Sequence, residues 1–151
     1  MMIAGYQSMK NFSCKSEFHH ERTQDLLRAY FQYLKSCNHV SMPEVFKSVV
    51  NMPAARFWVS ASRAAVVVAN IMRGDNLLYM RPNKREMFLE IHRRVVELRR
   101  VYSKWSLPRL IEAVVAQPAP RFYLAPGSAR VLILKARKQW FAAKSKRLRG
   151  C

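Results

Sequence analysis

The chain has 151 residues, half of them apolar, and its 27 Lys and Arg outnumber nine Asp and Glu to give a net charge of +18. The length allows one or two small domains, and the apolar content supports a packed core, which excludes a wholly disordered chain. Only four glycines argue against a β-sandwich or a glycine-rich nucleotide fold. The positive charge favours polyanionic partners, nucleic acid first and an anionic membrane surface second.

Residues 1–21 show no clear hydrophobic period, and we expect a loosely ordered N-terminal arm there. Cys14 lies near His19 and His20, but this spacing lacks the paired ligands of a zinc site, so we expect no metal and no cofactor. The three cysteines are scattered and odd in number, which indicates reduced thiols. We therefore expect a cytoplasmic protein, of a bacterium or a host, with the interior of a virion as the alternative. No stretch is typical of a secretory signal or a membrane span.

The first helix is expected from Thr23 to Cys37, where apolar residues recur at helical spacing. Ser41 and Glu44 then form the pattern of a capping box, and Pro43 suits the first turn of a short helix to about Asn51.

Pro53 ends that helix, because a proline disfavours helical geometry in the residue before it. We expect a further short helix from Pro53 towards Ser60. Ser60 can then cap a third helix over Ser62–Met72.

The stretch Ser41–Val68 occurs a second time in the chain in similar form. Shifted by 65 residues, it aligns without a gap with Ser106–Ile133, and ten of 28 positions are identical. The apolar spacing of the preceding helix is repeated as well, with low identity. An internal duplication is the natural interpretation. The sequence therefore predicts an all-α protein made of two tandem copies of a three- to four-helix, helix-turn-helix-like unit. The copies occupy residues 22–76 and 87–141, joined by a linker over 77–86 and followed by a basic tail over 142–151.

The second copy begins with the most regular helix, whose apolar stripe runs from Phe88 to Trp105. Its arginines fall off that stripe, where they are either a solvated face or phosphate contacts. We expect the third helix of each copy to pack across the long helix of the same copy. Trp140 and Phe141 interrupt the basic run that starts at Leu134 and are expected to pack on the second copy.

Catalytic chemistry finds no support in the sequence. It has no phosphate-binding glycine loop, no paired-cysteine motif and no zinc-protease motif, and its few acids are scattered singly. We expect no catalytic residues and no enzyme.

Nucleic-acid binding finds more support. The segment AVVAQPAPRFY, residues 113–123, resembles the helix-turn-helix cores of small DNA-binding proteins of phages and mobile elements. The resemblance is generic and covers about twenty residues per copy. It implies that a helix after the turn is presented to the DNA major groove.

Two equivalent arginines, Arg56 and Arg121, are the first candidates for contact with a base edge or a phosphate. The alternative is structural, with each arginine packing on the aromatic residue beside it. Phe57 and Phe122 are expected in the core. The other candidates are cations near the starts of the third helices and in the tail: Arg63, Arg130, Lys135, Arg137, Lys138, Lys144, Lys146, Arg147 and Arg149.

We therefore expect a nucleic-acid-binding protein, with double-stranded DNA favoured over RNA, in a regulatory or packaging role. The alternative is a structural component of a virion or ribonucleoprotein that neutralises packaged nucleic acid or holds structured RNA. A homo-oligomer or a larger assembly stays open.

Overall fold

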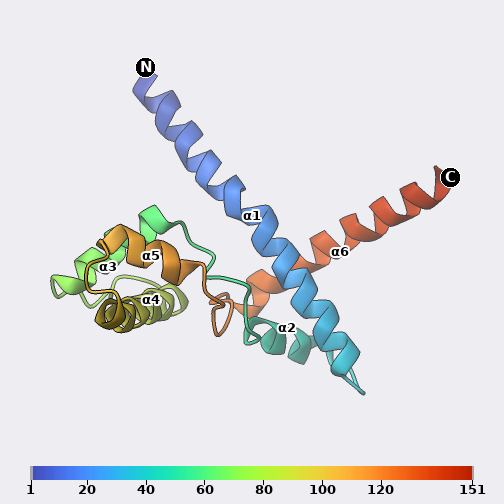
Figure 1. Ribbon diagram of the computed structural model, residues 1–151. Coiled ribbons are helices and arrows are strands. Elements are labelled where there is room, and N and C mark those ends of the chain that lie inside the picture. Colours follow the sequence, from blue (N-terminus) through green and yellow to red (C-terminus); the bar gives the residue numbers. More distant parts are fainter. Residues whose placement is uncertain (1, 151) are drawn as a thin grey trace. The chain divides into compact units, whose positions relative to one another are not determined.

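The computed structural model describes the backbone of residues 2–150 and the side chains of residues 18–150. Within this range the protein is all-helical, as predicted, and no β-strand is formed (Figure 1). The helices are α1 (Met2–Ser36), α2 (Met42–Val50), α3 (Ala61–Met72), α4 (Pro82–Val101), α5 (Leu107–Val115) and α6 (Pro126–Arg149).

The helix ends differ from the predictions at three places. Helix α1 begins at Met2, not at Thr23, so the backbone of the expected arm belongs to it from Met2 on. The Cys14 side chain, and with it the cysteine–histidine pattern, lies outside the described residues. Helix α4 begins at Pro82, inside the expected linker. Helix α6 continues to Arg149, through most of the expected tail.

The expected short helix over Pro53–Ser60 is wrong. The backbone of this segment is irregular and non-helical, and two of its N–H groups bond to distant parts of the chain. Ala54 and Ala119 exchange N–H···O=C bonds of 3.0 Å in both directions, and the Phe57 N–H donates to Val115 O at 3.1 Å. Ala54 and Ala119 are equivalent positions of the two copies, so the segments pair at matching points. A helix here would have to give up these long-range bonds.

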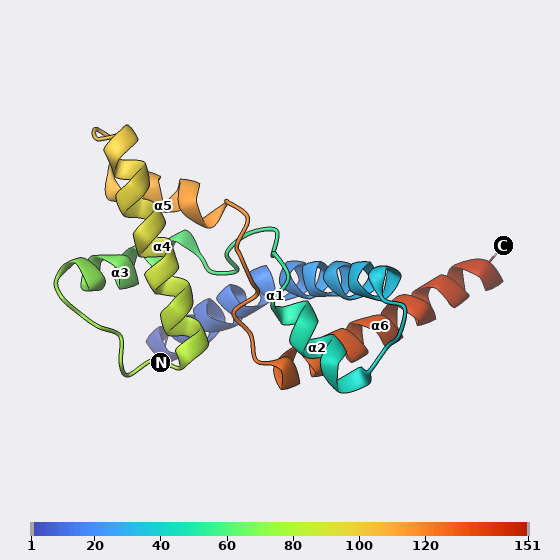
Figure 2. The ribbon, with the colours of Figure 1, turned by 90° about the horizontal axis from the view of Figure 1, so that it is seen from below.

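The chain forms two compact units. Unit 1 comprises residues 1–52 and 124–151 and contains α1, α2 and α6; unit 2 comprises residues 53–123 and contains α3, α4 and α5. In unit 1, α6 packs on α1 and α2, which lie beside it in both views (Figure 1, Figure 2). In unit 2, α3 packs on α4 and α5.

The two copies have therefore exchanged their third helices, and the prediction that each packs on its own long helix is wrong. Helix α3 belongs to the first copy but packs on helices of the second, and α6 does the reverse. Both third helices bury the same face, with Ala64 and Val68 in α3 matched by Ala129 and Ile133 in α6. Because the two helices bury equivalent positions, apolar periodicity cannot distinguish the two arrangements.

The burial pattern repeats with the shift of 65 residues that relates the copies. Each buried side chain in the following pairs has a buried equivalent: Leu26/Ile91, Tyr30/Val95, Val45/Leu110, Phe46/Ile111, Val49/Val114, Val50/Val115, Ala54/Ala119 and Phe57/Phe122. Phe57 and Phe122 lie in the core, as expected, with relative exposures of 1% and 5%.

A polar trio on the long helices also repeats. In α1, Arg28 donates to Asp25 at 2.6 Å and to Gln32 at 2.9 Å. At the equivalent places in α4, Arg93 donates to Glu90 and to Glu97, each at 2.6 Å. Sequence identity between these trios is confined to the arginine, so the repetition is visible only in the contacts.

Candidate nucleic-acid interface

Helix α6 contains eight of the 27 Lys and Arg residues of the chain and no acidic residue. It is anchored in unit 1 by the face that holds Ala129, Ile133 and Ala136, all buried. Pro126 suits its first turn, where a missing N–H is harmless. The small side chains Ala129 and Ala136 allow close approach to α1 and α2.

Beyond Ala136 the helix has no buried face. Every residue from Arg137 to Arg149 is exposed, and six of these thirteen residues are Lys or Arg. The last turns of α6 extend away from α1 and α2 in both views (Figure 1, Figure 2). At 1.5 Å per residue the exposed part is about 20 Å long. It is a basic helix that is largely surrounded by solvent.

Four cations of α6 form one stripe on the side away from the buried face. Lys135, Lys138, Lys146 and Arg149 are exposed, and at 100° per residue they fall within about 80° of arc. We call these four residues the outer stripe. No acid of α6 opposes it, so the four charges are available to an external anion.

Other cations of α6 lie over aromatic rings. Arg137 stands 5.5 Å above the Phe141 ring and Lys144 stands 5.1 Å above the Trp140 ring. Trp140 in turn contacts Phe31 of α1, with ring centroids 5.6 Å apart. The expectation that Trp140 packs on the second copy is therefore wrong; it packs on the first because α6 is exchanged. Arg147 and its neighbours Lys146 and Arg149 occupy the exposed last turn.

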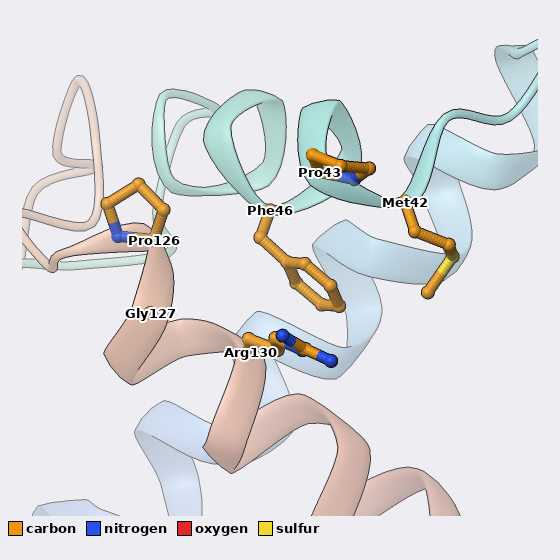
Figure 3. A pocket seen from close by; sticks show the side chains of 6 residues that line it. All are labelled: Met42, Pro43, Phe46, Pro126, Gly127 and Arg130. Carbon is orange, nitrogen blue, oxygen red and sulfur yellow. The ribbon is translucent and has the colours of Figure 1, made fainter.

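Arg130 lies near the start of α6 beside a pocket of about 360 Å³ lined by Met42, Pro43, Phe46, Pro126 and Gly127. Its side chain and the Phe46 ring point toward one another (Figure 3). The guanidinium is the one charged group in this otherwise apolar lining. Arg63, the candidate at the start of α3 in unit 2, is exposed, and its backbone N–H donates to the Ser60 hydroxyl.

Arg56 and Arg121 lie in the two segments that pair through Ala54 and Ala119, and both make contacts within the protein. Arg56 donates to the carbonyls of Phe57 and Val59, each at 3.1 Å, and lies over the Trp58 ring. Arg121 donates to Glu86 at 3.1 Å and to Asn83 at 2.7 Å, and lies over the Tyr123 ring. These contacts match the structural alternative for both arginines.

Two arginines of α4 are similarly engaged inside unit 2. Arg93 lies between Glu90 and Glu97. Arg94 donates to Pro118 O at 2.9 Å and stands 4.9 Å above the buried Phe57 ring. Burial raises the pKa of the nearby Tyr123 hydroxyl above its ordinary value. Through their hydrogen bonds, Arg94 and Arg121 connect the segment around Pro118 to α4.

Sequence reasoning missed a group at the junction of α4 and α5. The predicted apolar stripe includes Tyr102 and Trp105, but α4 ends at Val101 and the two rings stack outside it with centroids 4.1 Å apart. Arg109 stands 4.1 Å from the Trp105 ring centroid. The missed signal was a departure from the repeat, because the equivalent residues of the first copy are Cys37, Val40 and Glu44.

Comparison with protein-family models, with curated proteins and with solved structures finds no match. None of the helices in the described part of the chain has both the length and the apolar character needed to cross a lipid bilayer.

Proposed function

We propose that the protein binds nucleic acid, double-stranded DNA in particular, through helix α6. The observation that carries the proposal is the exposed, acid-free helix over Arg137–Arg149, together with the outer stripe. Its charges have no carboxylate within the helix to neutralise them. Lys135 and Lys138, like Lys146 and Arg149, are three residues apart and therefore neighbours on the helix surface, where like charges repel. Phosphates placed along the helix would relieve this repulsion and release counterions.

The dimensions of α6 favour duplex over single strand. An α-helix with its side chains is about 10–12 Å wide, and the major groove of B-DNA is about 12 Å wide. Cations that project on several sides of such a helix reach the phosphates of both groove walls. In this proposal α6 takes the place that the helix-turn-helix resemblance gave to the segment after Pro118. Arg56 and Arg121 make no DNA contact in it.

The test replaces all four residues of the outer stripe by Gln. We expect the affinity for a duplex to fall, and the slope of log affinity against log salt to shrink by up to about 0.9 for each phosphate that is no longer neutralised. A matched control replaces four exposed cations elsewhere by Gln, namely Lys35, Arg73, Arg81 and Lys84. Both variants remove four charges. Equal reductions of affinity would show that only net charge matters and would remove α6 from the proposal.

A structural role in a virion or ribonucleoprotein is the second candidate. It is favoured by the distribution of cations on several sides of α6, which suits charge neutralisation more than the reading of one base sequence. Competition between a selected duplex, random duplex and structured RNA separates the two roles. A regulator prefers its selected duplex, whereas a neutralising protein binds all three with affinities set by their charge density.

A further inference from the structure

We propose that the α4–α5 corner, residues 99–109, is a second nucleic-acid site that stacks unpaired bases of a single strand. It lies in unit 2 and shares no residue with α6. The site consists of a stacked Tyr102–Trp105 pair set among cations.

The geometry of the pair suits stacking on a further ring. The rings of Tyr102 and Trp105 are nearly parallel, at 15°, with centroids 4.1 Å apart, and Arg109 contacts the Trp105 ring. Trp105 is thereby held in place, while 43% of the surface of Tyr102 is exposed. A base on the open side of Tyr102 would extend the stack.

The surrounding charge matches a phosphate backbone. The corner contains Arg99, Arg100, Lys104 and Arg109, and no acid occurs between Leu98 and Ile111. All four cations are exposed. Aromatic rings among cations are the features by which proteins bind single strands, with stacking for the bases and charge for the backbone.

The duplication supplies an internal comparison for this corner. The α1–α2 corner of the first copy has the same length, and α2 and α5 have nine residues each with the same buried positions. At the three places of the stack it carries Cys37, Val40 and Glu44. The corner therefore forms without a Tyr–Trp–Arg group, and the fold does not require the stack.

The ligand chemistry distinguishes this site from a duplex site. Bases in a duplex are already stacked on their neighbours, so an exposed tyrosine cannot reach a base face without opening the pair. Unpaired bases offer both faces and stack on aromatic side chains with little sequence preference. The natural ligand is then a single-stranded stretch of DNA or RNA.

The test measures binding of fluorescent oligo-dT to the full chain by anisotropy. We expect Tyr102→Ala to weaken binding at least about fivefold, and Tyr102→Phe, which keeps the ring, to bind as the parent does. The matched control is Cys37→Ala at the equivalent corner, which leaves oligo-dT binding unchanged. Parent-like binding by Tyr102→Ala would overturn the proposal.

A gain-of-function variant makes the test independent of damage to unit 2. The triple change Cys37→Tyr, Val40→Trp and Glu44→Arg rebuilds the stack on the first copy, and we expect it to raise oligo-dT affinity or stoichiometry. The outer-stripe variant separates the two proposals, since it should lose duplex binding but keep the effect of Tyr102→Ala on oligo-dT. If Tyr102→Ala weakens binding to anionic vesicles and not to oligo-dT, the corner is a membrane contact and the single-strand proposal fails.

Discussion

The third helices α3 and α6 occupy equivalent places in the two aligned stretches and differ in length and charge. Both bury an alanine and an aliphatic residue at matching places, Ala64 with Val68 and Ala129 with Ile133. Helix α3 has 12 residues and one cation, Arg63. Helix α6 has 24 residues and eight cations. The residues that pack are kept, and the additional charges lie outside the packed face.

The same division holds at the corners between helices. Val45 and Val49 of α2 match Leu110 and Val114 of α5 in burial, but the two corners differ in all three residues of the stack. A duplicated scaffold tolerates such change because exposed positions contribute little to stability. Exposed positions that differ between the two copies, beside buried positions that agree, are therefore the first candidates for a functional role.

The largest expected effect tests whether the two copies are equivalent in the core. Phe57→Ala and Phe122→Ala should each lower the free energy of unfolding by about 3–5 kcal/mol, since both rings are buried and truncation leaves a cavity. Chemical denaturation monitored by circular dichroism measures the loss.

The exposed equivalents Val66 and Val131 supply the control for these variants. Their relative exposures are 57% and 67%, so replacement by Ala should change the free energy of unfolding by no more than about 0.5 kcal/mol. If one phenylalanine variant melts like its parent while the other collapses, the copies are not equivalent in the core.

The sequence revealed the duplication and the helical class because both depend on apolar spacing, which local sequence determines. It did not reveal the exchange of α3 and α6. The segments that precede α3 and α6 pair at Ala54 and Ala119, whose reciprocal hydrogen bonds are backbone contacts between residues 65 positions apart, and apolar spacing does not report such contacts. The non-helical form of Pro53–Ser60 was missed for the same reason, because Pro53 suits a helix start and a non-helical segment equally well.

The candidate site was predictable in part. The acid-free run from Leu134 onward identified the α6 cations without a structure, since composition alone carries that signal. The tyrosine–tryptophan stack was hidden, because Tyr102 and Trp105 continue the helical spacing of Val95 and only the end of α4 at Val101 removes them from the stripe. Arg56 and Arg121 are identical residues of the two copies, yet their guanidinium groups make intramolecular contacts.

A smaller effect compares the two polar trios. Arg28→Gln should cost about 1–3 kcal/mol, because the Asp25 side chain is 5% exposed and loses a charged donor. Arg93→Gln should cost less, because Glu90 and Glu97 are both more exposed than Asp25 and solvent weakens their ion pairs with Arg93. Equal costs for Arg28→Gln and Arg93→Gln, measured by chemical denaturation, would show that burial of the acid does not distinguish the copies.

Arg93→Gln should also change how the stability of the protein depends on pH. The hydrogen bond from Arg93, opposed by partial burial, holds the pKa of Glu90 below its ordinary value. The stability it contributes is therefore present above the ordinary pKa of Glu and is lost as the pH falls through the lower, folded pKa. Arg93→Gln should raise the pKa of Glu90, which NMR titration of its side chain measures.

The smallest effect concerns the serines that precede α2 and α5. By sequence Ser41 has the better cap, with Glu44 three residues on, whereas Ser106 has Arg109 at that place. The structure has the reverse: Arg109 N–H donates to the Ser106 hydroxyl at 3.4 Å, and the Ser41 side chain makes no cap hydrogen bond.

We expect Ser106→Ala to lower the unfolding free energy by about 0.5–1 kcal/mol, near the low end for caps because the bond is long. Ser41→Ala should change it by a few tenths at most. Ser60→Ala, which removes the 3.1 Å cap of α3, serves as the positive control. If Ser41→Ala costs as much as Ser106→Ala, the capping box of α2 forms in solution and the two copies are more alike at this corner than their contacts indicate.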